Sequence, residues 1–289
     1  MAIDRLAALA AEPSVREVSW TERDVLLYHL GIGAGADPVA PAELRWVYEK
    51  NISVLPTFAM VAGQGVSAGD IAPPGMNLPG IDIDLRKILH GGQSLTMHGP
   101  IPASGSGVLS SRVADVWDKG KAAVIVLEQA AADVDGNPLW TSEMQIWARG
   151  EGGFGGPAGP ETSAVAPDRA PDKVLRSQTT ARQALVYRLS GDMNPLHADP
   201  DFAAHAGFDR PILHGLASYG VVCKAVVDDI LGGDADAVET FSARFAGSIY
   251  PGEAIETSVW REDNRLILHA VCPDRDGQAV LTHAHMEIR

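Results

Sequence analysis

The chain has 289 residues, a formal net charge of −14 and 46% hydrophobic residues. This length suits one large or two ordinary domains with a substantial core, and the hydrophobic content is typical of a soluble globular protein. The acidic excess argues against binding to nucleic acid or to anionic membranes, because no basic cluster offsets the repulsion.

The cysteines and the N-terminus indicate where the protein works. Cys223 and Cys272 are the only cysteines, which favours buried, reduced thiols in a cytosolic protein. Cys223 is a weak candidate nucleophile, because it falls inside a predicted helix with no evident base beside it. The N-terminus lacks a signal-peptide pattern, and no apolar run approaches the roughly 20 residues that span a bilayer. We therefore expect a cytoplasmic location.

Residues 1–150 form the first predicted domain. Residues 21–30 are expected to form a short helix capped by Thr21, and residues 43–50 an extended stretch. Residues 55–61 resemble the start of a longer helix, but the glycines and prolines that follow, up to residue 80, forbid its continuation. Alternating patterns then predict strands at 93–97, 109–117, 122–129 and 139–147, with a hairpin turn at Asp135-Gly136.

Residues 151–171 are rich in Gly, Pro and Ala and are expected to form a surface linker to a second domain at 172–289. In that domain a long apolar segment at 216–230 ends at Gly232-Gly233, as helices often do. Strands are predicted at 239–248, 254–261, 266–272 and 279–288, with a second hairpin signal at Asp276-Gly277.

The two halves look like diverged copies of one unit, each an antiparallel sheet wrapped around a helix, which makes the fold α+β. Both hairpin signals are followed by a strand that ends in arginine, and Tyr28 echoes Tyr187 in a similar local sequence. The first copy has Gly31, Gly33 and Gly35 where the second has an acid, an amide and an imidazole. One active site per chain follows.

That acid, amide and imidazole are Asp192, Asn194 and His197. On a regular helix Asp192 and His197 would point away from each other, so they need a bend to converge. Gly191 and Pro195 predict that bend. Alternatively, Asp192 and Asn194 only cap a helix that begins near residues 199–201.

A second feature, the run at 211–215, opens the long predicted helix. Its last residue, Gly215, presents a backbone N–H at the positive end of the helix dipole. Such an amide is suited to stabilise a developing oxyanion.

The run from Tyr187 to Ala203 resembles the signature of the type 2 enoyl-CoA hydratases, the MaoC-like (R)-hydratases. The pattern aromatic-x-Leu-Ser-Gly-Asp-x-Asn-Pro-Leu-His, then five residues and Ala, matches at every signature position. The resemblance covers nearly the whole chain and extends to two-part hydratases such as the hydratase portion of peroxisomal multifunctional enzyme type 2. It implies a double hot-dog fold. The glycines and prolines up to residue 80 leave the first copy with a shortened or missing central helix, and our hypothesis is that this loss makes room for an acyl tail.

The resemblance implies the reversible hydration of a (2E)-enoyl-CoA to the (3R)-3-hydroxyacyl-CoA. The catalytic roles then fall to Asp192, Asn194, His197 and Gly215, and the sequence leaves open which of Asp192 and His197 is the base. The reaction requires no cofactor and no metal. A cluster of His197 and His205 with Asp199 and Asp201 matches no recognised metal-ligand spacing.

The resemblance also implies that His90, Gly91, Lys119 and Phe245 contact the acyl-CoA. At Gly92 the sequence departs from the family, which usually has Glu there, and this puts the local hydrogen bonding in question. Without the family, His90 would equally well end a helical turn, Lys119 would be a solvated turn lysine, and Phe245 would belong to the core.

Other functions compete with the hydratase. A hot-dog thioesterase would use a carboxylate to activate water against the thioester carbonyl, and a (3R)-hydroxyacyl-acyl carrier protein dehydratase would act on a different carrier. A non-catalytic acyl-binding subunit is the third alternative. Because a two-copy chain already mimics a hot-dog dimer, monomer and homodimer both stay open.

Overall fold

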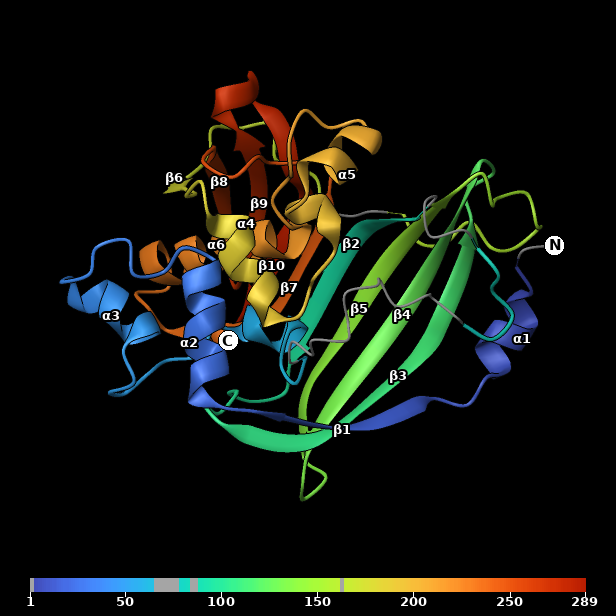
Figure 1. The fold of residues 1–289 in the computed structure, drawn as a ribbon, viewed down its shortest axis with the longest axis horizontal. Coiled ribbons are helices and arrows are strands. Elements are labelled where there is room, and N and C mark those ends of the chain that lie inside the picture. The colour runs from blue at the N-terminus through green and yellow to red at the C-terminus, as the bar shows by residue number, and fades with distance from the viewer. Residues whose placement is uncertain (1–2, 65–77, 84–87, 162–163) are drawn as a thin grey trace.

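The computed structural model describes residues 3–64, 78–83, 88–161 and 164–289. Its centre is one antiparallel sheet of ten strands in the order β1-β3-β4-β5-β2-β7-β10-β9-β8-β6 (Figure 1). The strands are β1 (Ser14–Trp20), β2 (Ile88–Met97), β3 (Gly105–Asp118), β4 (Ala122–Asp133), β5 (Pro138–Arg149), β6 (Lys173–Gln178), β7 (Val238–Phe245), β8 (Ala254–Glu262), β9 (Arg265–Cys272) and β10 (Gln278–Ile288).

The sheet consists of two units with the same topology. In each unit the first strand is an edge, followed in space by the third, fourth, fifth and second strands of that unit. The two second strands, β2 and β7, pair with each other and join the halves, with Gln93 opposite Ala243. This arrangement confirms the predicted double hot-dog fold.

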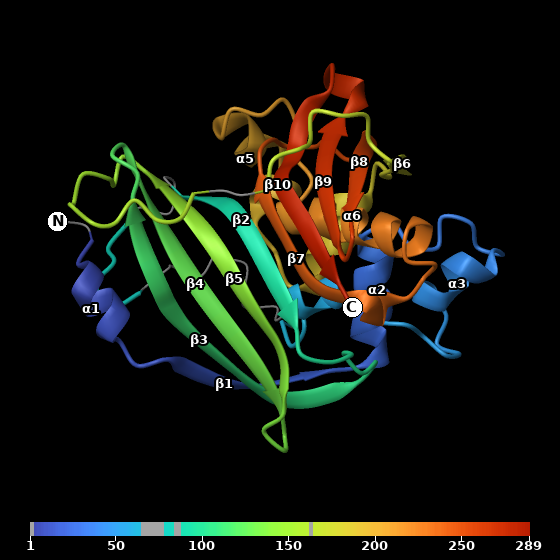
Figure 2. The ribbon, with the colours of Figure 1, turned by 180° about the vertical axis from the view of Figure 1, so that it is seen from behind.

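Helix α6 (Gly215–Asp229) is the central helix of the second unit. Most of its apolar residues are buried, and strands β6, β7 and β8 pack against it (Figure 2). The ring of Tyr219 stacks on Phe241 with centroids 4.0 Å apart, and its hydroxyl donates to the Phe241 carbonyl. A Cβ at Gly220 would lie 2.6 Å from the Tyr28 hydroxyl, so the glycine allows the first half to pack directly on this helix.

The equivalent segment of the first unit forms only a short 3-10 helix, η1 (Pro56–Met60), followed by a turn. All five residues of η1 are buried. The glycines and prolines between 65 and 77, which were expected to end the helix, lie outside the described residues. Within the described part, the central helix is shortened as predicted.

Two shorter helices connect the strands of the first unit. Helix α2 (Glu22–Gly31) begins at the predicted cap, where Thr21 and Asp24 form a reciprocal capping box. The prediction of an extended stretch at 43–50 is wrong, because α3 (Pro41–Val47) is helical there. Pro41 pre-sets the first helical turn and Glu43 follows in it, so capping outweighs the alternation.

Helix α1 (Arg5–Ala10) and the two edge strands β1 and β6 carried no clear signal in the sequence. In β1 only Val18 and Trp20 are buried, and in β6 only Leu175, so neither strand has a buried alternating face.

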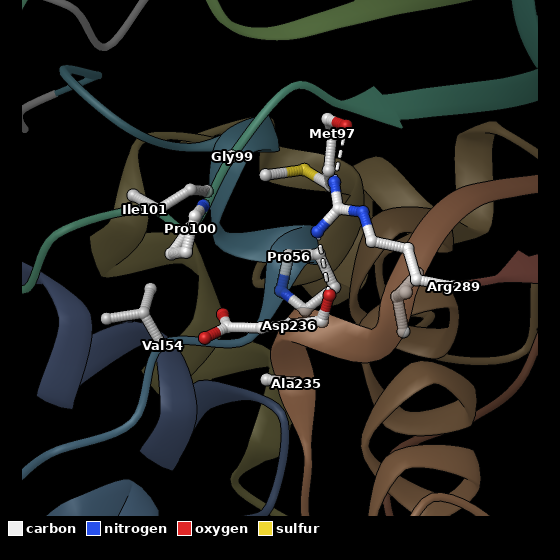
Figure 3. Close-up of a pocket in the computed structure, with 10 residues that line it drawn as sticks. Val54, Pro56, Met97, Gly99, Pro100, Ile101, Ala235, Asp236 and Arg289 are labelled. Carbon is white, nitrogen blue, oxygen red and sulfur yellow. Dashed lines mark hydrogen bonds between the residues drawn. The ribbon is translucent and has the colours of Figure 1, made fainter.

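A narrow cavity of about 10 Å³ lies where the C-terminus meets the first unit (Figure 3). The Arg289 guanidinium borders it and donates to the carbonyl oxygens of Met97, from the first half, and Asp236, from the second. This cavity is too small for a substrate. The two hydrogen bonds of Arg289 beside it connect the units. Among the described residues, none of the helices is both long and apolar enough to cross a membrane.

A buried histidine connects three segments of the first unit. His29 on α2 is fully buried, its Nδ1 lies 2.7 Å from the Trp46 carbonyl, and its Nε2 lies 3.2 Å from the Leu55 amide. A carbonyl only accepts and an amide only donates, so His29 is neutral with its proton on Nδ1. Burial lowers its pKa to about 4.

We expect His29 to make the fold sensitive to acid. The unfolded chain binds a proton near pH 6.5 and the folded chain only near pH 4, so stability is complete above pH 6.5 and falls as the pH drops towards 4. The loss is about 3 kcal/mol for this group. Urea unfolding at several pH values measures it. His29→Gln should flatten this part of the pH dependence, whereas the surface variant His205→Gln should leave it intact. Equal pH dependence in wild type and His29→Gln would contradict the assignment.

Candidate active site

The predicted bend lies between two short helical segments. Helix α4 (Gln183–Tyr187) continues into the 3-10 turn η3 (Arg188–Ser190), and Gly191 then reverses the chain with φ of 130°. A Cβ at Gly191 would lie 2.6 Å from the Gln64 carbonyl oxygen, so only glycine fits. This confirms the conformational role predicted for Gly191.

The polar side chains after the bend shape the loop themselves. The Asp192 carboxylate accepts a hydrogen bond from the backbone N–H of Asn194 at 3.1 Å. The side-chain oxygen of Asn194 accepts from the backbone N–H of Leu196 at 3.0 Å. Asn194 therefore caps the 3-10 turn η4 (Pro195–His197), and its NH₂ group is the part left to contact a ligand. Helix α5 (Pro200–His205) is capped by Asp199. The alternative in which Asp192 and Asn194 cap that helix is therefore wrong.

His197 is held in a defined tautomer. Its side chain is 8% exposed, and Nδ1 lies 2.9 Å from the Ile212 carbonyl oxygen. Because a carbonyl only accepts, Nδ1 carries the proton and Nε2 has a free lone pair. Burial lowers the pKa of His197, opposed by the charge of Asp192 and by the hydrogen bond to Ile212. His197 is thus neutral near pH 7 and able to accept a proton.

Asp192 and His197 converge, as the sequence predicted. One carboxylate oxygen of Asp192 and one nitrogen of each of His197 and His214 lie within 4.8 Å of one another. Asp192 is exposed, whereas both histidines are buried. The carboxylate can therefore meet a ligand from the solvent side while the imidazole of His197 stays desolvated.

His214 completes this group from the other segment. It is the N-cap residue of α6 and 1% exposed, and its ring stacks on His197 with centroids 3.7 Å apart. Its Nε2 lies 3.2 Å from the Asp192 carbonyl oxygen. The ring packs on its neighbour, but the His214 side chain caps no helical amide.

Gly215 opens α6 immediately beyond His214. It is exposed, and as the first helical residue its N–H has no partner within the helix. Phe245 lies beside it, because a Cβ at Gly215 would meet the phenyl ring at 3.2 Å. The helix therefore presents its first amide beside an aromatic wall.

His90 joins this wall from the first unit. It lies in strand β2 and not at the end of a helical turn, with its ring 4.6 Å from that of Phe245. The pairing of β2 with β5 shifts register at Gly91, a bulge that redirects the chain beside His90. At Gly92, where the family usually has Glu, the backbone carbonyl and the Gln93 side-chain oxygen share the His90 Nε2–H, each at 3.1 Å.

Lys119 stands apart from these residues. It lies in the β3–β4 turn, and strands β5 and β2 separate that part of the sheet from the second unit (Figure 1). Its Nζ lies 5.5 Å from the centre of the Trp117 ring. The neighbouring Asp118 shapes the turn by accepting from the amides of Gly120, Gly153 and Gly155, each at 2.8 Å.

One further possibility for the site is a metal ion held by Asp192, His197 and His214, but the geometry of the two rings excludes it. A histidine binds a metal through a lone pair that lies in the plane of its ring. The rings of His197 and His214 are stacked with only 27° between their planes, so one ion cannot lie in both. The other group, which matches no metal-ligand spacing, has different roles: Asp199 caps α5, and His205 Nδ1 bonds to the Asp201 carbonyl.

Comparison with known proteins assigns both halves to described families. Residues 18–150 match the MFE-2 hydratase 2 N-terminal domain, and residues 162–274 match the MaoC-like domain. The chain is 51% identical to enoyl-CoA hydratase ChsH3 of Mycobacterium tuberculosis, over 98% of each protein. It is 38% identical to peroxisomal multifunctional enzyme type 2 of Mus musculus, over 93% of this chain and 36% of that protein. The crystal structure of a MaoC-like dehydratase from Phytophthora capsici superposes with a TM-score of 0.89 at 28% identity, covering 99% of this chain and 98% of that one.

The bend can be tested by adding a methyl group to glycines with positive φ. Gly191→Ala meets both the unfavourable dihedral angle and the Gln64 carbonyl, whereas Gly207→Ala, with φ of 87°, points into open space. We expect Gly207→Ala to cost about 1–2 kcal/mol of unfolding free energy. Gly191→Ala should cost at least about 1 kcal/mol more, because the loop must move. Urea unfolding of both variants measures the difference, and equal losses would show that the bend tolerates a side chain.

Proposed function

The chain belongs to the family of MaoC-like type 2 hydratases, and on this premise we propose that it adds water reversibly to a (2E)-enoyl-CoA to give the (3R)-3-hydroxyacyl-CoA. The observation that carries the proposal is the convergence of the Asp192 carboxylate and the His197 imidazole at the first turn of α6. The (3R) configuration follows the family resemblance.

Hydration needs a base for water, an acid for C2 and a donor for the thioester oxygen. In the proposed reaction a water molecule loses a proton as its oxygen bonds to C3. The electrons of the C2–C3 double bond shift towards the carbonyl and give an enolate. A proton then reaches C2, and the thioester carbonyl re-forms.

We assign the base to His197. Its Nδ1–H is committed to the Ile212 carbonyl, so the lone pair of Nε2 is the acceptor for the water proton. The Asp192 carboxylate orients the water and stabilises the imidazolium that forms, and the imidazolium returns the proton to C2. The NH₂ group of Asn194 is available to hold the same water.

Gly215 supplies the oxyanion donor in this proposal. Its N–H lies at the positive end of the 15-residue helix α6 and needs no reorganisation when the enolate forms. Removing one donor of this type commonly costs about 3–4 kcal/mol of barrier. His90, Gly91 and Phe245 would flank the thioester, because the Phe245 ring lies beside Gly215 and the His90 ring packs on Phe245 at the β2–β7 junction.

The acyl tail and the CoA are assigned to the first unit. The central helix of that unit is reduced to the five-residue η1, and we propose that the space it gave up accepts the tail. Lys119 would meet a CoA phosphate as a point charge.

The proposal also divides the chain by function into a substrate-binding repeat at 1–150, a linker at 151–171 and a catalytic repeat at 172–289. A cytoplasmic location remains part of the proposal and is supported by the two free, buried cysteines.

Asp192→Asn and His197→Gln should each lower the turnover of crotonyl-CoA hydration by at least about a hundredfold while the protein stays folded. Loss of absorbance by the conjugated double bond measures hydration, and a thiol reagent run in parallel measures thioester hydrolysis. The matched controls Asp201→Asn and His205→Gln, on the exposed face of α5, should keep wild-type rates. Wild-type rates in both site variants would contradict the proposed roles of Asp192 and His197. Release of free thiol without loss of the double bond would identify a thioesterase.

Lys119→Ala should raise KM for an enoyl-CoA about five- to tenfold with little change in kcat, because one point charge is lost from a phosphate contact. The same substitution should not change KM for the corresponding pantetheine thioester, which has no phosphate. Lys121→Ala, in the same turn, is the control. Equal effects of Lys119→Ala on both substrates would exclude a phosphate role.

A further inference from the structure

His214 is enclosed by the groups that surround the acid/base pair. Its ring stacks on His197 at 3.7 Å on one side and contacts the Tyr187 ring at 4.8 Å. Its backbone provides the N-cap of α6, directly before Gly215. A single residue therefore contacts His197 and the backbone of Asp192 through its side chain, and begins through its backbone the helix that offers the proposed oxyanion donor.

The hydrogen bonding of His214 defines its chemical state. The Asp192 carbonyl can only accept, so the His214 Nε2 donates to it. The other nitrogen, Nδ1, is buried and has no hydrogen-bond partner in the described part of the chain. A buried acceptor without a partner costs about 1–3 kcal/mol. A phenylalanine could fill the same space without this cost, so the imidazole indicates that the bond to Asp192 is needed.

His214 also stays neutral. The titratable and charged groups that face it are His197 from η4, Asp192 from the bend, and Arg188 and Tyr187 from the segment before it. Burial and the neighbouring His197 lower the pKa of His214 to about 3, although Asp192 opposes them. Of the two stacked imidazoles, therefore, only His197 is available to carry a proton during turnover.

We propose that His214 is a positioning residue for the hydration reaction: its neutral ring keeps His197 desolvated by stacking, and its Nε2–H holds the backbone of Asp192 so that both groups face the same water. This role rests on the proposed hydratase function. His214 itself need not touch the substrate.

Two substitutions separate the two contacts. His214→Phe keeps a ring against His197 and loses the donor to Asp192, so kcat should fall about tenfold or more while the acid limb of kcat/KM stays in place. His214→Gln keeps a donor near Nε2 and loses the ring. It should retain more of kcat, and the acid limb should move to higher pH, because His197 is less desolvated and its pKa rises towards the ordinary value. His205→Gln is the control for both.

The outcomes distinguish this proposal from the proposed function. A wild-type protein that does not hydrate enoyl-CoA contradicts the function itself. Hydration by wild type together with unchanged kcat and pH profiles in both folded His214 variants overturns only the positioning role. If neither variant folds, ¹⁵N NMR of the histidine rings in wild type decides. A His214 ring that keeps its proton on Nε2 and does not titrate between pH 5 and 8 supports the proposal, and one that protonates in that range overturns it.

Discussion

The hydrogen bond from His197 Nδ1 to the Ile212 carbonyl is the contact on which the site depends. It joins two segments that are 15 residues apart in the chain. Two further bonds reinforce the junction: Ile212 N donates to the Leu196 carbonyl at 3.3 Å, and His214 Nε2 donates to the Asp192 carbonyl. Together they fix the tautomer of His197 and place the bend against the start of α6.

The symmetry of the fold explains why, among the described residues, only the second copy has such a junction. Tyr28 and Tyr187, the tyrosines that echo each other in the sequence, meet with ring centroids 6.0 Å apart. The glycines that follow Tyr28 then serve as a packing surface for the second copy. The Gly31 carbonyl accepts from Gln183, and a Cβ at Gly31 would lie 3.0 Å from the Tyr187 Cα. Larger side chains at these glycines would displace α4, so the first copy supports the bend of the second copy instead of duplicating it.

Local patterns predicted most of this architecture. The inner strands and α6 bury a regular face, so their hydrophobic periodicity is visible in the sequence. The bend is visible because it combines glycine and proline with an acid and an imidazole. The edge strands were missed because their residues are largely exposed. Helix α3 was misread because a capping proline outweighed an alternating pattern. The stacking of His214 on His197 was invisible for another reason: the two lie 17 positions apart and meet only when the bend packs on α6. The sequence likewise could not place Lys119 at a distance from the other residues.

The proposed thioester contacts belong to neither copy alone. His90 comes from β2 and Phe245 from β7, and their 4.6 Å separation is set by the pairing of these strands. Across that junction Gly92 lies opposite Arg244, and a Cβ at Gly92 would meet the Ala243 carbonyl at 3.2 Å. A side chain in place of Gly92 would thus crowd the pairing that holds the two rings together. Because both copies lie in one chain, the junction forms at a high effective concentration and does not depend on association of separate subunits. The first copy therefore needs no acid/base loop of its own to supply half of the proposed binding wall.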